Sequence, residues 1–230
     1  MKSNKIFIVI PAYNEHKSLP KVLSELKSAG YKNIVLVDDG SSDDTSLIGI
    51  KNNVYTLRHP VNLGQGAALR TGILFALKQG ADIIITFDAD GQHQVSDIKN
   101  LVKPIIEGKA EVVLGSRFCK GSRVENIPLS RKILLKLAVL FTRVMSNIKV
   151  TDTHNGLRAL SRRAAEKINI TINGMAHASE ILDEVSKHNL SFVEVPVTIK
   201  YTEYSLKKGQ SKLNAFRIAF RFIIKKLLDW

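Results

Sequence analysis

Short apolar runs rich in β-branched residues recur through the first half of the chain, and they constrain the fold more than any other feature. Runs that are nearly all apolar are typical of strands buried on both faces of a parallel sheet. Because segments with helical spacing alternate with them, we predict a mostly parallel α/β sheet flanked by helices. The predicted strands are residues 5–10, 33–37, 54–58, 83–87 and 110–114, and the helices between them include residues 67–78 and 95–107.

Polar residues follow the ends of these strands. In a parallel α/β sheet, ligands bind at the carboxyl ends of the strands. This rule places residues 11–15, 38–43, 88–92 and 115–117 on one rim, and three of these four segments carry carboxylates. So much negative charge at one edge is better explained by a metal ion bound with a nucleotide diphosphate than by ordinary loops.

The segment Asp88-Ala89-Asp90-Gly91-Gln92 is the candidate metal site on this rim. Mg²⁺ and Mn²⁺ prefer oxygen ligands and commonly bind one or two carboxylates together with substrate phosphates. We therefore predict Mg²⁺ or Mn²⁺ held by Asp88 and Asp90, with Gln92 as a further oxygen ligand. Taken alone, the same segment is equally typical of a strand followed by an Asp-Gly turn.

Charge is distributed unevenly along the 230 residues. Residues 1–116 hold 13 Lys and Arg against 12 Asp and Glu, whereas residues 117–230 hold 21 against 9. This asymmetry indicates an anionic partner: nucleic acid, an acidic membrane surface or a phosphorylated substrate. A nucleic-acid-binding protein is the distant alternative, because aromatics are few, are not interleaved with the basic residues, and accompany no binding motif.

Several separated motifs resemble those of family 2 glycosyltransferases with the GT-A fold. They are Val9-Ile10-Pro11-Ala12-Tyr13-Asn14-Glu15, Val37-Asp38-Asp39-Gly40-Ser41-Ser42-Asp43 and Asp88-Ala89-Asp90-Gly91-Gln92. Gly115-Ser116-Arg117, residues 151–158 and Gly209-Gln210-Ser211-Lys212 extend the likeness towards the branch of dolichol-phosphate mannose synthase and bacterial polyprenyl-phosphate glycosyltransferases. The chain departs from that branch where it reads Asp152-Thr153-His154-Asn155-Gly156-Leu157-Arg158 in place of Asp-Pro-Thr-Ser-Gly-Phe-Arg.

The resemblance implies roles for individual residues. Arg117 and Arg131 are expected to bind phosphate, since a guanidinium can hold two phosphate oxygens. Asp38 is also explained by a turn that caps the next helix. The expected nucleotide-sugar-binding residues are Pro11, Tyr13, Glu15, Asp38, Asp39, Asp88 and Gln92.

The need for a general base depends on the acceptor. A lipid phosphate is already an anion, whereas a sugar hydroxyl must lose a proton to a positioned carboxylate. Asp152 and Glu180 are the candidates for that base. Asp90 is the third expected catalytic residue, because it would hold the metal ion.

The resemblance implies an inverting, metal-dependent enzyme that moves a hexose-type sugar from a UDP- or GDP-linked donor to polyprenyl phosphate. The alternative is transfer to a saccharide hydroxyl in cell-surface polysaccharide synthesis. We expect one GT-A domain over residues 1–212, with a nucleotide-sugar half at 1–116 and an acceptor half at 117–212.

Two segments indicate a membrane surface. Residues 131–148 are mostly apolar but interrupted by basic side chains, and residues 213–230 form a predicted basic amphipathic helix that suits a bilayer interface or a membrane-protein partner. No stretch reaches the roughly 20 uncharged residues of a membrane span. With no signal peptide and a lone Cys119, we expect a cytoplasmic protein, peripheral on the inner face of the cell membrane.

Overall fold

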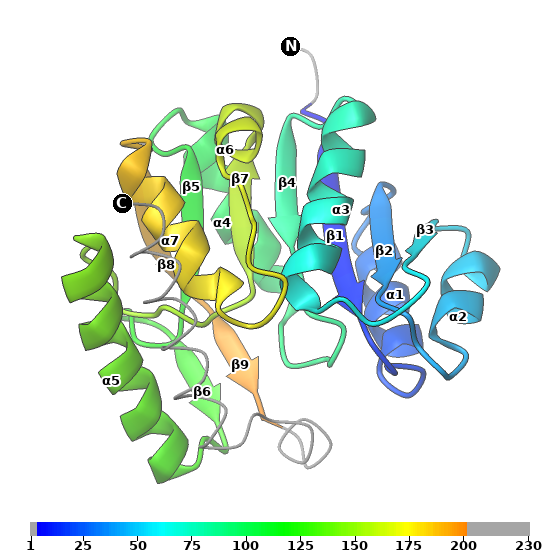
Figure 1. Cartoon of the computed structure of the whole chain (residues 1–230), viewed down its shortest axis with the longest axis horizontal. Helices are drawn as coiled ribbons and strands as arrows, with labels where there is room; N and C mark the ends of the chain where they lie inside the picture. The colour runs from blue at the N-terminus through cyan, green and yellow to red at the C-terminus, as the bar shows by residue number, and fades with distance from the viewer. Residues whose placement is uncertain (1–3, 202–230) are drawn as a thin grey trace.

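The structure is a computed structural model that describes residues 4–201. Its centre is a seven-stranded sheet with the strand order β3-β2-β1-β4-β7-β5-β8 (Figure 1). Neighbouring strands are parallel except where β7 pairs with β4 and β5. The strands are β1 (Ile6–Ala12), β2 (Ile34–Asp38), β3 (Tyr55–Arg58), β4 (Ile83–Thr86), β5 (Val112–Ser116), β7 (Arg158–Ser161) and β8 (Phe192–Pro196).

A second, two-stranded parallel sheet pairs β6 (Arg123–Glu125) with β9 (Thr198–Lys200). The helices are α1 (Leu19–Ser28), α2 (Thr45–Lys51), α3 (Gln65–Lys78), α4 (Ile98–Ile106), α5 (Leu129–Ser146), α6 (Arg162–Lys167) and α7 (His177–Lys187), with a short 3-10 helix η1 (Val95–Asp97) before α4. The predicted α/β class and mostly parallel sheet are confirmed.

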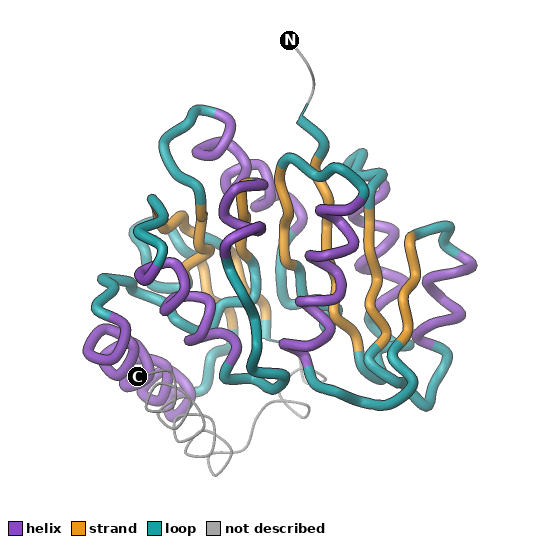
Figure 2. The backbone as a smooth tube through the Cα atoms, turned by 45° about the horizontal axis from the view of Figure 1, so that its top comes forward, coloured by secondary structure: helices purple, strands orange, loops and turns teal. Residues whose placement is uncertain are grey.

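Helices cover both faces of the large sheet (Figure 2), and a layer of buried apolar side chains lies on each face. Successive strand residues point to opposite faces, so a strand buried on both sides must be apolar throughout. In β1, Phe7 and Val9 pack in the layer that contains α3, α6 and α7, whereas Ile8 and Ile10 pack in the layer that contains α1 and α4. This explains the unbroken apolar runs of the sequence.

Strand β7 is the main departure from the predicted organisation, because no strand is predicted at residues 158–161. Its antiparallel pairing places Thr86 opposite Arg158, so the amino end of β7 meets the carboxyl end of β4. The loop that precedes β7 therefore reaches the rim where the predicted metal carboxylates lie.

Residues 202–230 lie outside the described part of the chain. The predicted amphipathic helix at 213–230, the Gly209-Gln210-Ser211-Lys212 element and the domain boundary at 212 fall there, and they remain predictions. Within residues 4–201, no helix combines the length and apolarity needed to cross a bilayer.

Candidate active site

A cavity of about 470 Å³ opens where β1, β2, β4 and β5 end. Its volume is within the range of sites for small organic ligands. Each of the four segments predicted to share this rim contributes to the lining. The lining includes Pro11, Tyr13, Glu15, Asp39, Gln65, Asp88, Asp90, Gln92, His93, Arg117, Arg131, His154, Asn155, Gly156 and Met175.

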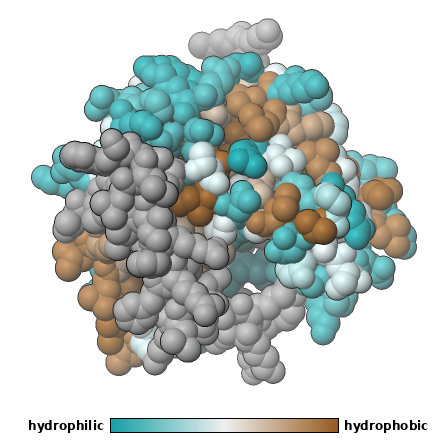
Figure 3. All heavy atoms as spheres, viewed as in Figure 1, coloured by the Kyte–Doolittle hydropathy of each residue, from teal (hydrophilic) through white to brown (hydrophobic). Residues whose placement is uncertain are grey.

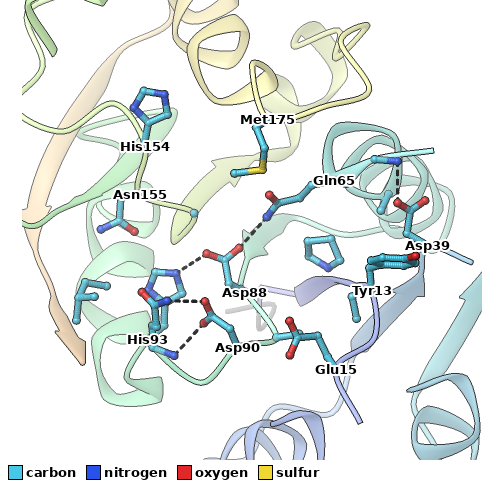
Figure 4. A pocket seen from close by; sticks show the side chains of 18 of the residues that line it. Tyr13, Glu15, Asp39, Gln65, Asp88, Asp90, His93, His154, Asn155 and Met175 are labelled. Atoms are coloured by element: carbon cyan, nitrogen blue, oxygen red, sulfur yellow. Dashed lines mark hydrogen bonds and ion pairs between the residues drawn. The ribbon is translucent and has the colours of Figure 1, made fainter. Parts of the chain in front are cut away.

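Asp88 lies in the middle of this cavity and is held from two sides (Figure 4). Gln65 donates from Nε2 to one carboxylate oxygen over 3.1 Å, and His93 donates from Nε2 to the other over 2.9 Å. Burial raises the pKa of Asp88, but the hydrogen bond and positive charge of His93, with the charge of Arg158, outweigh burial and keep that pKa below its ordinary value. Asp88 is therefore an oriented carboxylate anion.

Asp90 lies beside Asp88 in a less favourable setting for a negative charge. It accepts hydrogen bonds from the backbone N–H of Gln92 over 3.0 Å and from Gln92 Nε2 over 2.7 Å. Burial, reinforced by the negative charge of Asp88, raises the pKa of Asp90 to about 6. Two carboxylates that repel each other in a partly buried site would be stabilised by a cation between them.

Gly156 explains why the loop before β7 can approach Asp88. The hydroxyl of Thr86 donates to the carbonyl of Gly156 over 2.5 Å and fixes this loop to the end of β4. A Cβ atom at position 156 would lie 2.2 Å from Oδ2 of Asp88. Only a glycine leaves room for the carboxylate in the orientation that Gln65 and His93 impose.

We expect Gly156→Ala to lower kcat by roughly 10²-fold, because the added methyl group displaces Asp88 by about an ångström. Steady-state kinetics and the midpoint of thermal unfolding should be measured on the same preparation. A variant with unchanged kcat would show that the position of Asp88 against Gly156 does not matter for activity.

Asp39 lies to one side of Asp88 in the cavity, near the exposed ring of Tyr13 (Figure 4). Its carboxylate accepts hydrogen bonds from the backbone N–H groups of Leu63 and Gly64, over 3.0 and 2.7 Å, and from Nδ1 of His59 over 2.7 Å. Asp39 thus also fixes the loop before α3. Asp38 is fully buried outside the cavity lining and accepts from the backbone N–H of Ser41, as expected of a turn carboxylate.

Arg117 and Asp152 form a buried ion pair with two parallel hydrogen bonds. Nε and Nη2 of Arg117 each lie 2.6 Å from a carboxylate oxygen of Asp152, and the backbone N–H of Arg117 donates to the same group over 3.0 Å. Burial raises the pKa of Asp152, but Arg117 outweighs it and holds the pKa below its usual value. Asp152, predicted as a base, is a weak proton acceptor in this arrangement and does not line the cavity.

Glu180, the second predicted base, is also outside the cavity lining. Its carboxylate accepts from the backbone N–H and hydroxyl of Thr171, over 3.0 and 2.6 Å, and from the backbone N–H of Ile172 over 2.9 Å. The loop held in this way continues to Asn173, whose carbonyl accepts from the backbone N–H of Gly66 over 2.7 Å. The contacts of Glu180 fix this loop against the start of α3.

Several lining residues were not among the predicted site residues, and those with polar or long side chains include Gln65, His93, Asn155 and Met175. Gln65 follows the end of β3, so the rim rule could have found it. Met175 carries no comparable signal, because it reaches the cavity from a loop between α6 and α7. His154 also lines the cavity, and burial with the nearby charge of Arg117 lowers its pKa to about 4, which makes it neutral at pH 7.

Residues 7–169 match the family described as "Glycosyl transferase family 2". This match covers more than half of the 230 residues. The chain belongs to glycosyl transferase family 2. It is therefore a glycosyltransferase.

Relatives within this family extend over nearly the whole chain. The UDP-N-acetylglucosamine–dolichyl-phosphate N-acetylglucosaminyltransferase of Methanococcus voltae is 35% identical over 99% of this chain and 98% of its own length. The polyprenol monophosphomannose synthase of Mycolicibacterium smegmatis is 29% identical over 99% of this chain and 87% of its own. Among solved structures, glucosyl-3-phosphoglycerate synthase from Mycobacterium tuberculosis, in complex with Mn²⁺, UDP and phosphoglyceric acid, superposes with a TM-score of 0.75 at 19% identity, over 99% of this chain and 78% of that one. This superposition supports the GT-A fold.

Proposed function

We propose that this glycosyltransferase moves a sugar from a nucleotide-diphosphate sugar to a polyprenyl phosphate, with inversion at the anomeric carbon. The observation that carries the proposal is a single cavity whose lining includes two adjacent carboxylates, an aromatic ring with a further carboxylate, and two arginines: Asp88, Asp90, Tyr13, Asp39, Arg117 and Arg131. The relatives from M. voltae and M. smegmatis, whose names give dolichyl phosphate and polyprenol as acceptors, support the lipid acceptor.

The oxygen ligands available in the cavity fit a divalent cation. Asp88 and Asp90 supply carboxylate oxygens, the preferred ligands of Mg²⁺ and Mn²⁺, and the raised pKa of Asp90 indicates an uncompensated negative charge. A cation bound there would also take waters and substrate phosphates as ligands. Such an ion, when bound, stabilises the charge that the leaving diphosphate gathers.

The remaining predicted ligands divide along the cavity. Tyr13 and Asp39 would bind the nucleoside, and Pro11 and Glu15 line the same cavity. Gln92 lies next to Asp90, and in the structure its amide nitrogen faces that carboxylate. Exchange of the amide N and O positions would turn an oxygen towards a bound cation, because the two atoms are nearly interchangeable in shape.

The state of the two predicted bases favours a phosphate acceptor over a sugar hydroxyl. Asp152 is paired with Arg117, and Glu180 holds the loop at residues 171–172. A hydroxyl acceptor needs a carboxylate that is free to take its proton, whereas a phosphate monoester attacks as an anion. Transfer to a saccharide is therefore the alternative that the site supports less well.

The deciding experiment is a panel of UDP- and GDP-linked radiolabelled sugars incubated with the full chain, Mn²⁺ or Mg²⁺, and a polyprenyl phosphate. We expect label from one donor to enter a solvent-extractable lipid, and EDTA to abolish the transfer. Label found only in water-soluble saccharide, with an oligosaccharide acceptor present, would establish the alternative. Absence of transfer from every donor to either acceptor would contradict the proposed function.

We further propose that α5 binds the surface of an anionic membrane, where polyprenyl phosphates reside. Four large apolar side chains of α5 are more than half exposed: Leu129, Ile133, Leu137 and Leu140. They recur at spacings of four, four and three residues and so form one stripe along the helix, with exposed Lys132, Lys136 and Arg143 interspersed on it. Hydrophobic side chains on the lower left of Figure 3 correspond to the position of α5 in Figure 1.

The replacements Ile133→Ser and Leu137→Ser together should release the protein from vesicles that contain anionic phospholipid. Each apolar side chain that enters the interface contributes about 1 to 3 kcal/mol, so a fall in partition coefficient of tenfold or more is expected. Vesicle flotation measures it, and Leu74→Ser, an equally exposed leucine on α3, is the matched control. Equal flotation of all three proteins would place the membrane contact elsewhere in the chain.

A further inference from the structure

The two arginines of the cavity differ in the partners that hold them. Arg117 is committed to Asp152 through two of its guanidinium nitrogens, and its side chain is only 6% exposed. Arg131 also lines the cavity, but within residues 4–201 no carboxylate lies at ion-pair distance from it. Of the two arginines among the described lining residues, Arg131 is therefore the one whose charge is not already paired with a carboxylate.

Tyr201 contacts both arginines. Nη1 of Arg117 donates to the Tyr201 hydroxyl over 3.0 Å, and Cζ of Arg131 lies 4.9 Å from the centroid of the Tyr201 ring. This second distance is typical of a cation–π interaction. Tyr201 is itself buried, and its backbone N–H donates to the carbonyl of Glu125 over 3.2 Å, which continues the pairing of β9 with β6. The ring is thus fixed on one side by the small sheet and on the other by the buried ion pair.

The position of Arg131 in its helix is a second reason to expect that an anion binds there. Arg131 lies in the first turn of α5, an 18-residue helix with no acidic residue in that turn. The amino end of a helix carries a partial positive charge, so a cation there is unfavourable unless an anion lies nearby. The Tyr201 ring supplies part of this compensation through its negative face, and a bound phosphate would supply the rest.

We propose that Tyr201 is a positioning residue that holds Arg131 towards the cavity, where Arg131 binds phosphate oxygens of a substrate. In this arrangement the Arg117–Asp152 pair fixes the Tyr201 hydroxyl through the hydrogen bond from Arg117. Arg131 makes the principal ionic contact with the phosphate. The inference rests on the proposed function, and the phosphate belongs to either the donor diphosphate or the acceptor.

The experiment compares variants that separate the ring of Tyr201 from its hydroxyl. Tyr201→Phe keeps the ring under Arg131 and removes only the bond to Arg117, whereas Tyr201→Leu removes both. Two ligands distinguish the sources of phosphate: UDP or GDP with Mn²⁺, measured by calorimetry, and a short, water-soluble polyprenyl phosphate, measured by its KM. We expect Tyr201→Leu to weaken one of these two ligands by roughly three- to thirtyfold, and Tyr201→Phe to leave both within about twofold of wild type.

Two further measurements separate positioning from a loss of folding. Phenylalanines with one, two and three ring fluorines at position 201 keep the size of the ring but weaken its negative face, so the affected Kd or KM should rise stepwise with fluorine number. In the background of Arg131→Met the same series should have no effect.

Equal ligand binding across the fluorinated series in the wild-type background would overturn the proposal even if Tyr201→Leu fails to fold. So would a change in kcat with both ligands bound as in wild type. Failure of the wild-type protein to bind UDP or GDP and to transfer sugar would instead contradict the proposed function, so the two failures are distinguishable.

Discussion

Replacement of Asp90 by asparagine is expected to lower kcat roughly 10²- to 10³-fold, the loss typical of removing one electrostatic contact to a developing charge. The change keeps the shape of the side chain and one of its two hydrogen bonds with Gln92, but it removes one of the two carboxylate charges that would hold the cation beside the leaving diphosphate. Burial and Asp88 already disfavour that charge in the protein without ligands, so Asp90→Asn should not lower the free energy of unfolding. Steady-state kinetics over a range of Mn²⁺ concentrations provides the measurement.

Asp44→Asn is the matched control for this change. Asp44 precedes α2 near the same rim, is exposed and does not line the cavity. The Asp44→Asn variant undergoes the same change of charge away from the proposed metal site, so its kcat should stay within about twofold of wild type. Full Mn²⁺-dependent activity in Asp90→Asn would show that the ion is bound elsewhere.

Replacement of Asp152 by asparagine should instead lower the free energy of unfolding by about 3–5 kcal/mol, because Arg117 would keep its charge without a partner in a buried site. A midpoint of urea unfolding well below that of wild type, with the same m-value, is the expected measurement. Activity should fall as well, since Arg117 lines the cavity and would lose the carboxylate that holds it in place. A variant that keeps its stability and loses only kcat would restore Asp152 as the predicted base.

Glu107→Gln is the control for the loss of a carboxylate that pairs with a basic side chain. Glu107 pairs with Lys109 on the surface, where solvent screens the interaction, so the variant should unfold like wild type.

The ion pair of Asp152 also predicts how the free energy of unfolding changes with pH. Its folded pKa lies below the unfolded one, so its stabilisation is complete above the unfolded pKa and is lost as the pH falls through the folded pKa.

Much of the fold could be predicted because burial on both faces of a sheet leaves a strong signal. Ile83, Ile84 and Ile85 are fully or nearly fully buried, and a strand of this kind tolerates no polar alternation. The strand ends were equally visible, since polar residues follow each apolar run. The later strands were harder to predict: β8 is only partly buried, and β7 is a four-residue strand that ends with Ser161.

The residues of the nucleotide-sugar half of the site could also be predicted more readily than those of the acceptor half. Asp88 and Asp90 could be predicted, because the rim rule needs only the end of β4 and the chemistry of carboxylates. Asp152 and Glu180 were predicted as candidate bases, but the structure places both outside the cavity lining, where each is held by partners that the sequence does not indicate. Arg117 lies 35 residues before Asp152, and no local pattern indicates that the two meet.

The sequence by itself determined the parallel α/β class, the carboxylate rim and the resemblance to family 2, because each depends on residues close together in the chain. Only the tertiary structure decided how the second half completes the cavity. The antiparallel insertion of β7 between β4 and β5 brings Gly156 against Asp88, and the small sheet brings Tyr201 to both arginines. These contacts join residues 68 to 84 positions apart, and such contacts are fixed by packing rather than by local propensity.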